Sequence, residues 1–332
     1  MLVLIGEENS KRTLYMKKAA DSLNVPLQVC RWKELQSTFD LGQLKGAVVK
    51  ADPPSFQTVH LCRMQTQLEE YRRALMRLMQ AECRFLNSPE NICRLLDKRE
   101  TKRYLQERGI PVTRMFPGEL KTAGQLIETM KQRRCYSVFV KPRFFSGAAG
   151  VAAFRLHPIR GTMRLYTSCR WEGKQLINTK KLFYMDNQQE IIFLLNQLLS
   201  LDCVVERWHP KADFGGKSYD LRVVFQFGHI AHIVVRQSKG PITNLHLNNQ
   251  ALDVRQLGLA KATIEEIAAV CEQACALFPG LSMAGLDILL EKDTRQPRII
   301  EMNGQGDLIY QDIYHENRIY REQVAELCRK SI

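Results

Sequence analysis

Apolar and amphipathic segments alternate along the first part of the chain. Short apolar runs predict strands, and longer runs with apolar residues every three or four positions predict helices. We therefore expect strands at 2–6, 26–32 and 46–52 and helices at 10–23 and 62–83. Alternating strands and helices are typical of a parallel sheet covered by helices. The pattern predicts a small α/β unit at the N-terminus.

The middle of the chain has longer strands with helices between them. Ser88 and Pro89 have the sequence of a helix start, with Ser88 as the N-cap and Pro89 at the first helical position. A charged helix follows from Lys98 and is stopped at Gly109. The remaining elements are expected as a helix at 122–133, strands at 137–142, 151–156, 163–171 and 174–184, a helix at 190–199 and a strand at 203–210.

The last third of the chain predicts two hairpins with a helix between them. Strands at 218–228 and 229–238 are joined at Gly228-His229, and a helix is expected at 262–278. Two further apolar runs, 283–293 and 297–306, are separated by a turn, so we expect them to pair as a hairpin. Residues 307–330 form a helical, aromatic end segment.

The composition excludes several classes of protein. The chain has 332 residues, 45% hydrophobic and 25% charged, which is typical of a globular protein of two or three subdomains. No apolar run approaches the ~18 residues of a membrane-spanning helix, and the N-terminus does not resemble a signal peptide. The ten cysteines form no CxxC pair, which favours buried reduced thiols and a cytoplasmic location over a cysteine metal site.

The positive charge is concentrated in the first half of the chain. The net charge is +13, and residues 1–150 hold 26 lysines and arginines against 15 acidic residues. This half could bind an anionic partner such as a nucleic acid. The alternative is a set of solvated basic helix faces, which we favour because no nucleic-acid-binding motif accompanies the charge.

The segment from Ser137 to Val151 carries the first candidate chemistry. A strand ends at Lys141-Pro142, and a turn of small residues, Ser146 to Gly150, follows. Such a turn lets successive backbone N–H groups point at one anion, and the lysine adds a full positive charge beside it. No GxxxxGK[ST] sequence occurs, so this is not a P-loop. A surface lysine followed by an ordinary hairpin turn is the alternative interpretation.

The closing hairpin carries the second candidate. Glu301 and Asn303 lie two residues apart, so their side chains leave the same face of the strand, and Asp287 lies on the partner strand. Two carboxylates and an amide oxygen suit Mg²⁺ bound to nucleotide phosphates. The alternative is a pair of strand-end acids that make caps or salt bridges.

These motifs resemble, in their order, those of the ATP-grasp superfamily. The order is Lys98 at a helix start, Lys141 in Val-Lys-Pro, the small-residue turn, the hinge 204–210, the strand around Arg222, Arg236 and the closing acidic trio. The similarity covers roughly residues 85 to 306. It looks closest to glutathione-synthetase-type ligases and to bacterial ligases that add glutamate to a ribosomal protein, since residues 87–116 and 242–251 resemble segments of the latter.

The resemblance implies a three-part architecture. The expected fold is α/β with an α+β lid, in which ATP is held between two antiparallel α+β domains that follow an N-terminal parallel αβ unit. The implied domains are an N-terminal unit at 1–88, a central lid domain at 89–205 and a C-terminal catalytic and metal-binding domain at 206–332.

The resemblance also assigns roles to particular residues. It implies ATP and Mg²⁺ as cofactors, with magnesium held by Asp287, Glu301 and Asn303. Arg222 and Arg236 would face the reacting carboxylate, and Asn244 is the third residue implied in catalysis. Nucleotide binding is implied for Lys98, Lys141, Ser146, Gly147, Ala148, Gly150, Glu206, Arg207 and Trp208. Independently of the resemblance, Arg222 could instead form a structural pair with Asp220.

The function implied is that of a carboxylate–amine ligase that works through an acyl phosphate. Its substrate would be a carboxylate-bearing peptide or an amino-acid-like molecule, and a homodimer is the default expectation. Ile242 replaces the arginine of the glutamate-adding ligases, which removes a carboxylate contact and argues against glutamate as the substrate. Asn248-Asn249 replaces their double glycine, and asparagine tolerates the left-handed backbone of such a turn. The alternative is an ATP-binding regulatory protein without ligase turnover.

Overall fold

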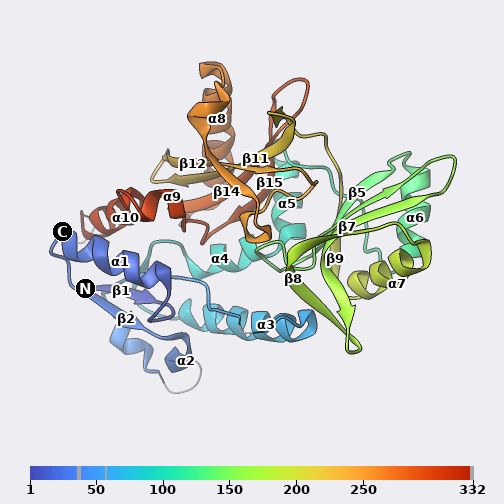
Figure 1. The fold of residues 1–332 in the computed structure, drawn as a ribbon. Coiled ribbons are helices and arrows are strands. Elements are labelled where there is room, and N and C mark those ends of the chain that lie inside the picture. The colour runs from blue at the N-terminus through green and yellow to red at the C-terminus, as the bar shows by residue number, and fades with distance from the viewer. Residues whose placement is uncertain (36–38, 57, 330–332) are drawn as a thin grey trace.

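The computed structural model describes residues 1–35, 39–56 and 58–329 as three lobes (Figure 1). The N-terminal lobe has a parallel sheet in the order β2-β1-β3-β4. Its strands are β1 (Leu2–Ile5), β2 (Leu27–Cys30), β3 (Val48–Ala51) and β4 (Arg84–Phe85), and its helices are α1 (Lys11–Ser22), α2 (Trp32–Leu35), η1 (Leu41–Leu44) and α3 (Leu61–Leu78). The predicted parallel α/β unit is therefore confirmed.

The central lobe, called the lid here, is an antiparallel sheet with two helices against it (Figure 1). The strand order is β8-β7-β6-β5-β9. The elements are α6 (Ala123–Gln132), β5 (Ser137–Pro142), β6 (Ala152–Leu156), β7 (Met163–Glu172), β8 (Gln175–Met185), α7 (Gln188–Leu199) and β9 (Cys203–Arg207).

The C-terminal lobe is built on a second antiparallel sheet, in the order β13-β12-β11-β14-β15, with β10 on β11. The strands are β10 (Asp213–Phe214), β11 (Lys217–Gln226), β12 (His229–Ser238), β13 (Gln250–Asp253), β14 (Met283–Leu290) and β15 (Pro297–Asn303). The helices are η2 (Leu245–Leu247), η3 (Val254–Leu257), α8 (Lys261–Ala276), α9 (Tyr310–Ile313) and α10 (Arg318–Arg329). Both predicted hairpins form.

Two short helices join the N-terminal lobe to the rest. Helix α4 (Pro89–Leu96) begins at the Ser88 N-cap with Pro89 in its first turn, as predicted. Helix α5 (Lys98–Glu107) follows with Asp97 as its N-cap. Leu95 and Leu105 are buried in the apolar core of the C-terminal lobe, so these helices are fixed against the sheet that carries the acidic trio.

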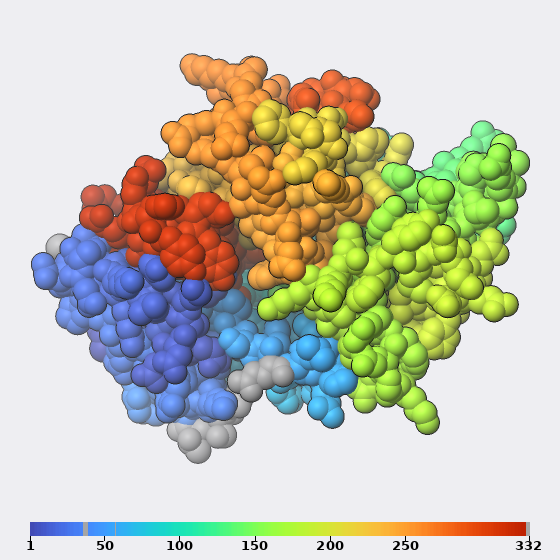
Figure 2. Space-filling model, viewed as in Figure 1, coloured from blue at the N-terminus to red at the C-terminus, as the bar shows by residue number. Residues whose placement is uncertain are grey.

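The end segment divides into two helices rather than running on. Asp312 accepts hydrogen bonds from the backbone N–H groups of Arg318 and Ile319, and so caps the start of α10. Asn317, with φ of +51°, makes the break between α9 and α10. Helix α10 then packs on α1, and the red end segment lies on the blue N-terminal lobe in Figure 2. No helix within the described residues is long and apolar enough to span a membrane.

Gly150 closes the turn between β5 and β6 and generates the first prediction. Its φ is +66°, and a Cβ there would lie 2.8 Å from Pro142 Cγ and 3.2 Å from Leu61 Cδ1. Gly109 has a similar φ of +76°, but a Cβ there would have nothing within 4 Å.

We expect Gly150→Ala to lower the free energy of unfolding by about 3 kcal/mol, because backbone strain adds to a steric clash. Gly109→Ala should cost about 1 kcal/mol, since only the strain applies. Urea denaturation of both variants measures the difference. Equal losses would contradict the tight packing described for Gly150.

Candidate active site

The lid and the C-terminal sheet enclose a cleft of about 750 Å³, its open mouth included. One wall comes from β5 and β9, and the other from β11, β12, β14 and β15. Figure 1 shows these two sheets side by side, with α5 behind them. The cleft is lined by the basic residues Lys98, Lys141, Arg207, Lys211 and Arg236 and by the acidic residues Glu206, Asp220, Asp287 and Glu301.

Glu206 is the centre of a buried ion cluster at the lid side of the cleft. Its carboxylate lies 2.5 Å from Lys102 Nζ and 2.9 Å from Lys141 Nζ. The hydroxyl of Thr113 donates to the same carboxylate at 2.8 Å and accepts from Lys102 Nζ at 2.6 Å. Glu206 is 2% exposed. Three residues from α5, the following extended segment and β5 therefore converge on one carboxylate of β9.

Opposing effects set the charges in this cluster. Burial alone raises the pKa of Glu206, but the ammonium groups of Lys102 and Lys141 lower it to about 2. Burial lowers the pKa of Lys102 to about 8, although the negative charge of Glu206 opposes the shift. Glu206 is thus ionised at neutral pH and holds both lysines beside the cleft.

The sequence interpretation missed Lys102. This lysine lies four residues after Lys98 on α5, so both side chains leave the same face of the helix. That spacing was the available signal, but the neighbouring charges of the helix made it look like a solvated surface. The structure buries Lys102 to 3% exposure, and it is the closest cation to Glu206.

A second ion network lies on the C-terminal sheet and alternates in charge. Lys211 Nζ is 2.9 Å from Asp220, and Asp220 is 2.7 Å from Arg236 Nε. Arg236 Nη2 is 3.1 Å from Asp287, and Asp287 is 2.6 Å from Arg222 Nε. Burial acts to raise the pKa of Asp220, but Arg236 and Lys211 hold it well below its usual range.

The strand register explains this alternation. Asp220 is opposite Arg236 across β11 and β12, and Arg222 is opposite Asp287 across β11 and β14. Opposite residues of an antiparallel pair have neighbouring side chains. Asp220 therefore pairs with Arg236, and Arg222 pairs with Asp287, in place of the Asp220–Arg222 pair considered from the sequence.

The acidic trio lies on the β14–β15 hairpin. Asp287 is opposite Glu301, and Gly285 is opposite Asn303. Lys98 Nζ lies 3.2 Å from Glu301, whose side chain is 20% exposed. Asn303 makes no side-chain hydrogen bond within residues 1–35, 39–56 and 58–329. Two carboxylates and an amide oxygen on one hairpin fit Mg²⁺. A cluster of three or more His, Cys, Asp or Glu side chains that could hold a metal ion is not found among the described residues.

The small-residue turn closes against the rest of the cleft. Its backbone is held from both sides, because Lys98 Nζ donates to the carbonyl of Phe145 and Ser168 donates to the carbonyl of Ala148 at 2.6 Å. Gly147, Ala148 and Gly150 have positive φ. Among the described residues, the backbone N–H groups of Ser146, Gly147 and Ala148 have no hydrogen-bond partner, so these groups of the turn can donate to an anion.

The predicted hinge is only partly open to the cleft. The Glu206 side chain points into its ion cluster, and the backbone N–H groups of Arg207 and Trp208 donate to Arg114 and Ser137. The ring centroids of Trp208 and Phe139 are 5.2 Å apart. The guanidinium carbon of Arg155 lies over the Trp208 ring, 3.9 Å from its centroid.

The sequence-predicted residues divide into two groups in the structure. Those that line the cleft are Lys98, Lys141, Ala148, Glu206, Arg207, Arg236, Asn244, Asp287 and Glu301. Those that lie next to it without lining it are Ser146, Gly147, Gly150, Trp208, Arg222 and Asn303.

The Glu206 cluster generates a prediction for stability and its pH dependence. We expect Glu206→Gln to lower the free energy of unfolding by about 3 kcal/mol at pH 7, because two buried lysines lose their partner. The ionised carboxylate stabilises the fold above its unfolded pKa of 4.5, and this contribution is lost as the pH falls through about 2. The difference between wild type and variant should therefore shrink below pH 4.5.

Chemical denaturation between pH 2 and 8 measures this difference. Glu100→Gln is the matched control, because Glu100 lies on α5, the helix that carries Lys102, in an exposed pair with Arg103. It should change stability by less than about 0.5 kcal/mol. A Glu206 variant as mild as the control would disprove the cluster.

No protein-family model matches the sequence, and neither does any curated protein. Solved structures do match over nearly the whole chain. D-cycloserine synthetase DcsG is 14% identical with a TM-score of 0.63, over 98% of this chain and 99% of that one. The macrocyclase MdnC of Microcystis aeruginosa MRC, bound to precursor peptide MdnA, is 12% identical with a TM-score of 0.62, over 99% and 100%.

A third solved structure is the ATP-grasp ligase PsnB in complex with precursor peptide PsnA2 and AMPPNP. It is 13% identical with a TM-score of 0.58, over 100% of this chain and 97% of that one. At these identities the similarity concerns the backbone fold. The lobes, both antiparallel sheets and the cleft between them all lie within the matched length. The chain therefore has the ATP-grasp fold.

Proposed function

We propose that this protein is an ATP- and Mg²⁺-dependent ligase that joins a carboxylate to an amine through an acyl phosphate. The observation that carries the proposal is the surplus of positive charge around the cleft. Its ion pairs contain six cations, Lys98, Lys102, Lys141, Lys211, Arg222 and Arg236, and four carboxylates, Glu206, Asp220, Asp287 and Glu301. A site of this kind attracts a polyanion such as a triphosphate.

The lysines suit the transferring phosphoryl group. Phosphoryl transfer is catalysed by positioning and by stabilising the charge that develops on the phosphoryl oxygens. Lys141 and Lys98 both line the cleft, one on the lid and one at the start of α5. Glu206 and Glu301 hold their ammonium groups, so little reorganisation is needed when a nucleotide binds. We assign phosphate contacts to both lysines and to the N–H groups of Gly147 and Ala148.

The acidic trio suits the metal. Asp287, Glu301 and Asn303 would hold Mg²⁺, which supplies charge neutralisation to phosphate oxygens when bound. Asp287 already contacts Arg222 and Arg236, so a substrate carboxylate near this trio would meet forked guanidinium groups. We assign orientation of the reacting carboxylate to these two arginines, and we include Asn244 in the catalytic set because it also lines the cleft.

Two steps then give the amide. A carboxylate oxygen of the substrate forms a bond to the γ-phosphorus, and the bond from that phosphorus to the β–γ bridging oxygen breaks to release ADP. The amine nitrogen attacks the acyl carbon, the carbon–oxygen bond to phosphate breaks, and the amine loses a proton. The lid turn at 146–150 excludes water, which would otherwise hydrolyse the acyl phosphate.

The structural neighbours support the substrate class. Two of them are described as bound to precursor peptides, and a third as a D-cycloserine synthetase. We therefore propose a peptide or an amino-acid-like molecule as the carboxylate substrate. We also propose a cytoplasmic location, because all ten cysteines are free, and a homodimer, the commonest oligomer of soluble proteins.

Phosphate release tests the proposal directly. Purified protein with ATP and Mg²⁺ should release phosphate at a rate that rises at least tenfold when a suitable carboxylate and amine are added, because the acyl phosphate forms only on a bound carboxylate. A panel of amino acids and short peptides supplies the candidates. ATP binding without stimulated release across the panel would favour the regulatory alternative.

Single substitutions test the residues assigned to the site. Lys141→Ala and Glu301→Ala should each reduce ATP turnover by about 10³-fold or more, since each removes charge stabilisation at the phosphoryl group or its metal. Lys131→Ala, on the exposed surface of α6, is the control and should keep full turnover. Circular dichroism checks that all three variants fold. Wild-type turnover in either site variant would refute the assignment.

A further inference from the structure

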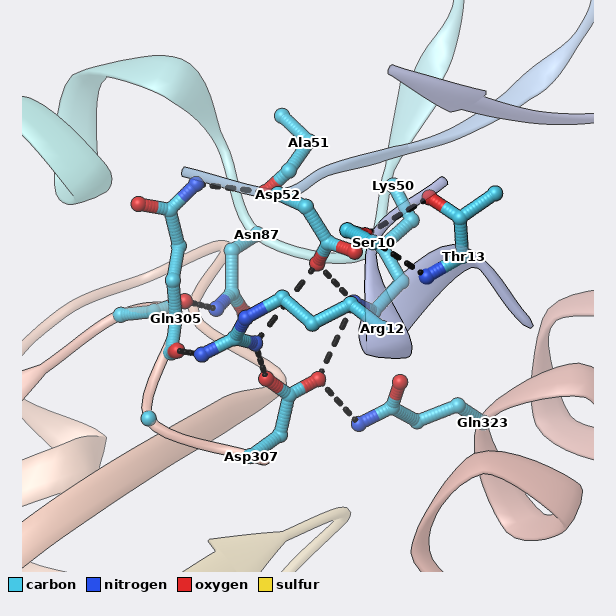
Figure 3. A network of polar contacts seen from close by, with 12 residues as sticks. Ser10, Arg12, Thr13, Lys50, Ala51, Asp52, Asn87, Gln305, Asp307 and Gln323 are labelled. Carbon is cyan, nitrogen blue, oxygen red and sulfur yellow. Dashed lines mark hydrogen bonds and ion pairs between the residues drawn. The ribbon is translucent and has the colours of Figure 1, made fainter. Parts of the chain in front are cut away.

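The loop that follows the acidic trio is held by the N-terminal lobe. This loop, residues 304–307, begins directly after Asn303 and is called the post-hairpin loop here. Figure 3 shows its residues Gln305 and Asp307 surrounded by residues from α1, from the end of β3 and from α10. These elements belong to no part of the cleft described above.

Asp307 anchors the loop in a buried ion cluster. Arg12 donates to one oxygen of Asp307, and Lys50 Nζ lies 3.0 Å from the other. Lys50 also contacts Asp52, and Gln323 Nε2 donates to Asp307 at 3.2 Å. Asp307 is 0%, Asp52 2% and Lys50 3% exposed, and the side chain of Arg12 is 16% exposed, so the cluster is largely buried.

Hydrogen bonds hold two further residues of the loop, Gln305 and Gly304. Arg12 Nη2 donates to the carbonyl of Gln305 at 2.9 Å. The Gln305 side chain accepts from the Tyr71 hydroxyl at 2.9 Å and donates to the carbonyl of Ala51 at 2.6 Å. Asn87 Nδ2 donates to the carbonyl of Gly304 at 2.6 Å. Arg12, Ala51 and Tyr71 belong to the N-terminal lobe, and Asn87 lies just before α4, where that lobe joins the rest of the chain.

Gly306 connects the loop to the trio itself. A Cβ on Gly306 would lie 2.6 Å from the Cα of Gly285, which is the residue opposite Asn303. Arg222 Nη1 is 3.4 Å from the carbonyl of Gly306, while its Nε binds Asp287. A movement of the loop would therefore displace both strands of the hairpin that carries the acidic trio.

The ion cluster of Arg12, Lys50, Asp52 and Asp307, called the junction here, has no net charge. Two cations, Arg12 and Lys50, face two carboxylates, Asp52 and Asp307. This balance differs from that of the cleft, where the cations exceed the carboxylates. A neutral, largely buried network has no surplus charge that would attract a ligand. It does hold its members in place, because the removal of one partner leaves a buried charge unpaired.

We propose that this junction is a positioning device for the metal trio, with Arg12 and Tyr71 as its positioning residues. The inference rests on the proposed function, since it needs magnesium at Asp287, Glu301 and Asn303. Groups that orient metal ligands without touching the metal typically change metal affinity 10–100-fold when removed. The N-terminal lobe thus sets how well the C-terminal hairpin holds magnesium.

Calorimetric titration with the non-hydrolysable nucleotide AMPPNP, with excess Mg²⁺ and with EDTA, tests the proposal. Arg12→Met should weaken the Mg²⁺-dependent binding about tenfold and leave binding in EDTA within twofold, because the lysines of the cleft stay in place. Arg12→Lys keeps the charge for Asp307 and should recover part of the loss. Tyr71→Phe, which removes one hydroxyl and preserves packing, should weaken the Mg²⁺-dependent binding severalfold.

Asp312→Asn is the matched control. Asp312 is a buried carboxylate in the same end segment, but it caps α10 and does not contact the post-hairpin loop. This variant should lower the melting temperature and leave the Mg²⁺ effect unchanged. A Mg²⁺ effect in wild type that survives in Arg12→Met and Tyr71→Phe would overturn the positioning role alone. No Mg²⁺ effect in wild type would overturn the proposed function itself.

Discussion

The rest of the cleft depends on one buried carboxylate, that of Glu206, which pairs with two lysines. Two ammonium groups beside each other in a buried site repel, and burial without a partner disfavours their charged form. Glu206 lies between Lys102 and Lys141 and keeps both in reach of the cleft. Because Lys102 belongs to α5 and Lys141 to the lid, the same interaction also ties the lid to the helix that packs on the C-terminal sheet.

The two polar networks of this protein have opposite charge balance and hence different roles. Around the cleft the cations outnumber the carboxylates, and the remaining positive charge favours an anionic ligand. At the junction of Figure 3 the charges cancel, and the network holds the post-hairpin loop in place. The hairpin of β14 and β15 is connected to both networks, because Asp287 and Glu301 belong to the cleft network and the loop that follows β15 carries Asp307 of the junction.

Hydrophobic periodicity predicted the order and type of the longer elements, because apolar faces are a property of local sequence. It did not predict the short elements α2, β4, β10 and β13. It also placed Lys141 correctly near the end of a strand, and Asp287 and Glu301 on the two strands of one hairpin. Side-chain partners depend on register and on contacts between distant segments, which periodicity does not contain. Arg222 therefore pairs with Asp287 rather than Asp220, and Lys102 reaches Glu206 across more than a hundred positions. The junction of Arg12 with Asp307 had no sequence signal, since its members are single polar residues of ordinary helices and turns.

The proposed function requires one nucleotide pocket between Lys141 and Glu301. A crystal structure with a non-hydrolysable ATP analogue and Mg²⁺ tests it most directly. We expect the triphosphate to lie between the lid turn and the β14–β15 hairpin, with its oxygens in contact with Lys98 and Lys141 and the metal on Asp287, Glu301 and Asn303. A nucleotide bound elsewhere, or a metal bound away from this hairpin, would contradict the account.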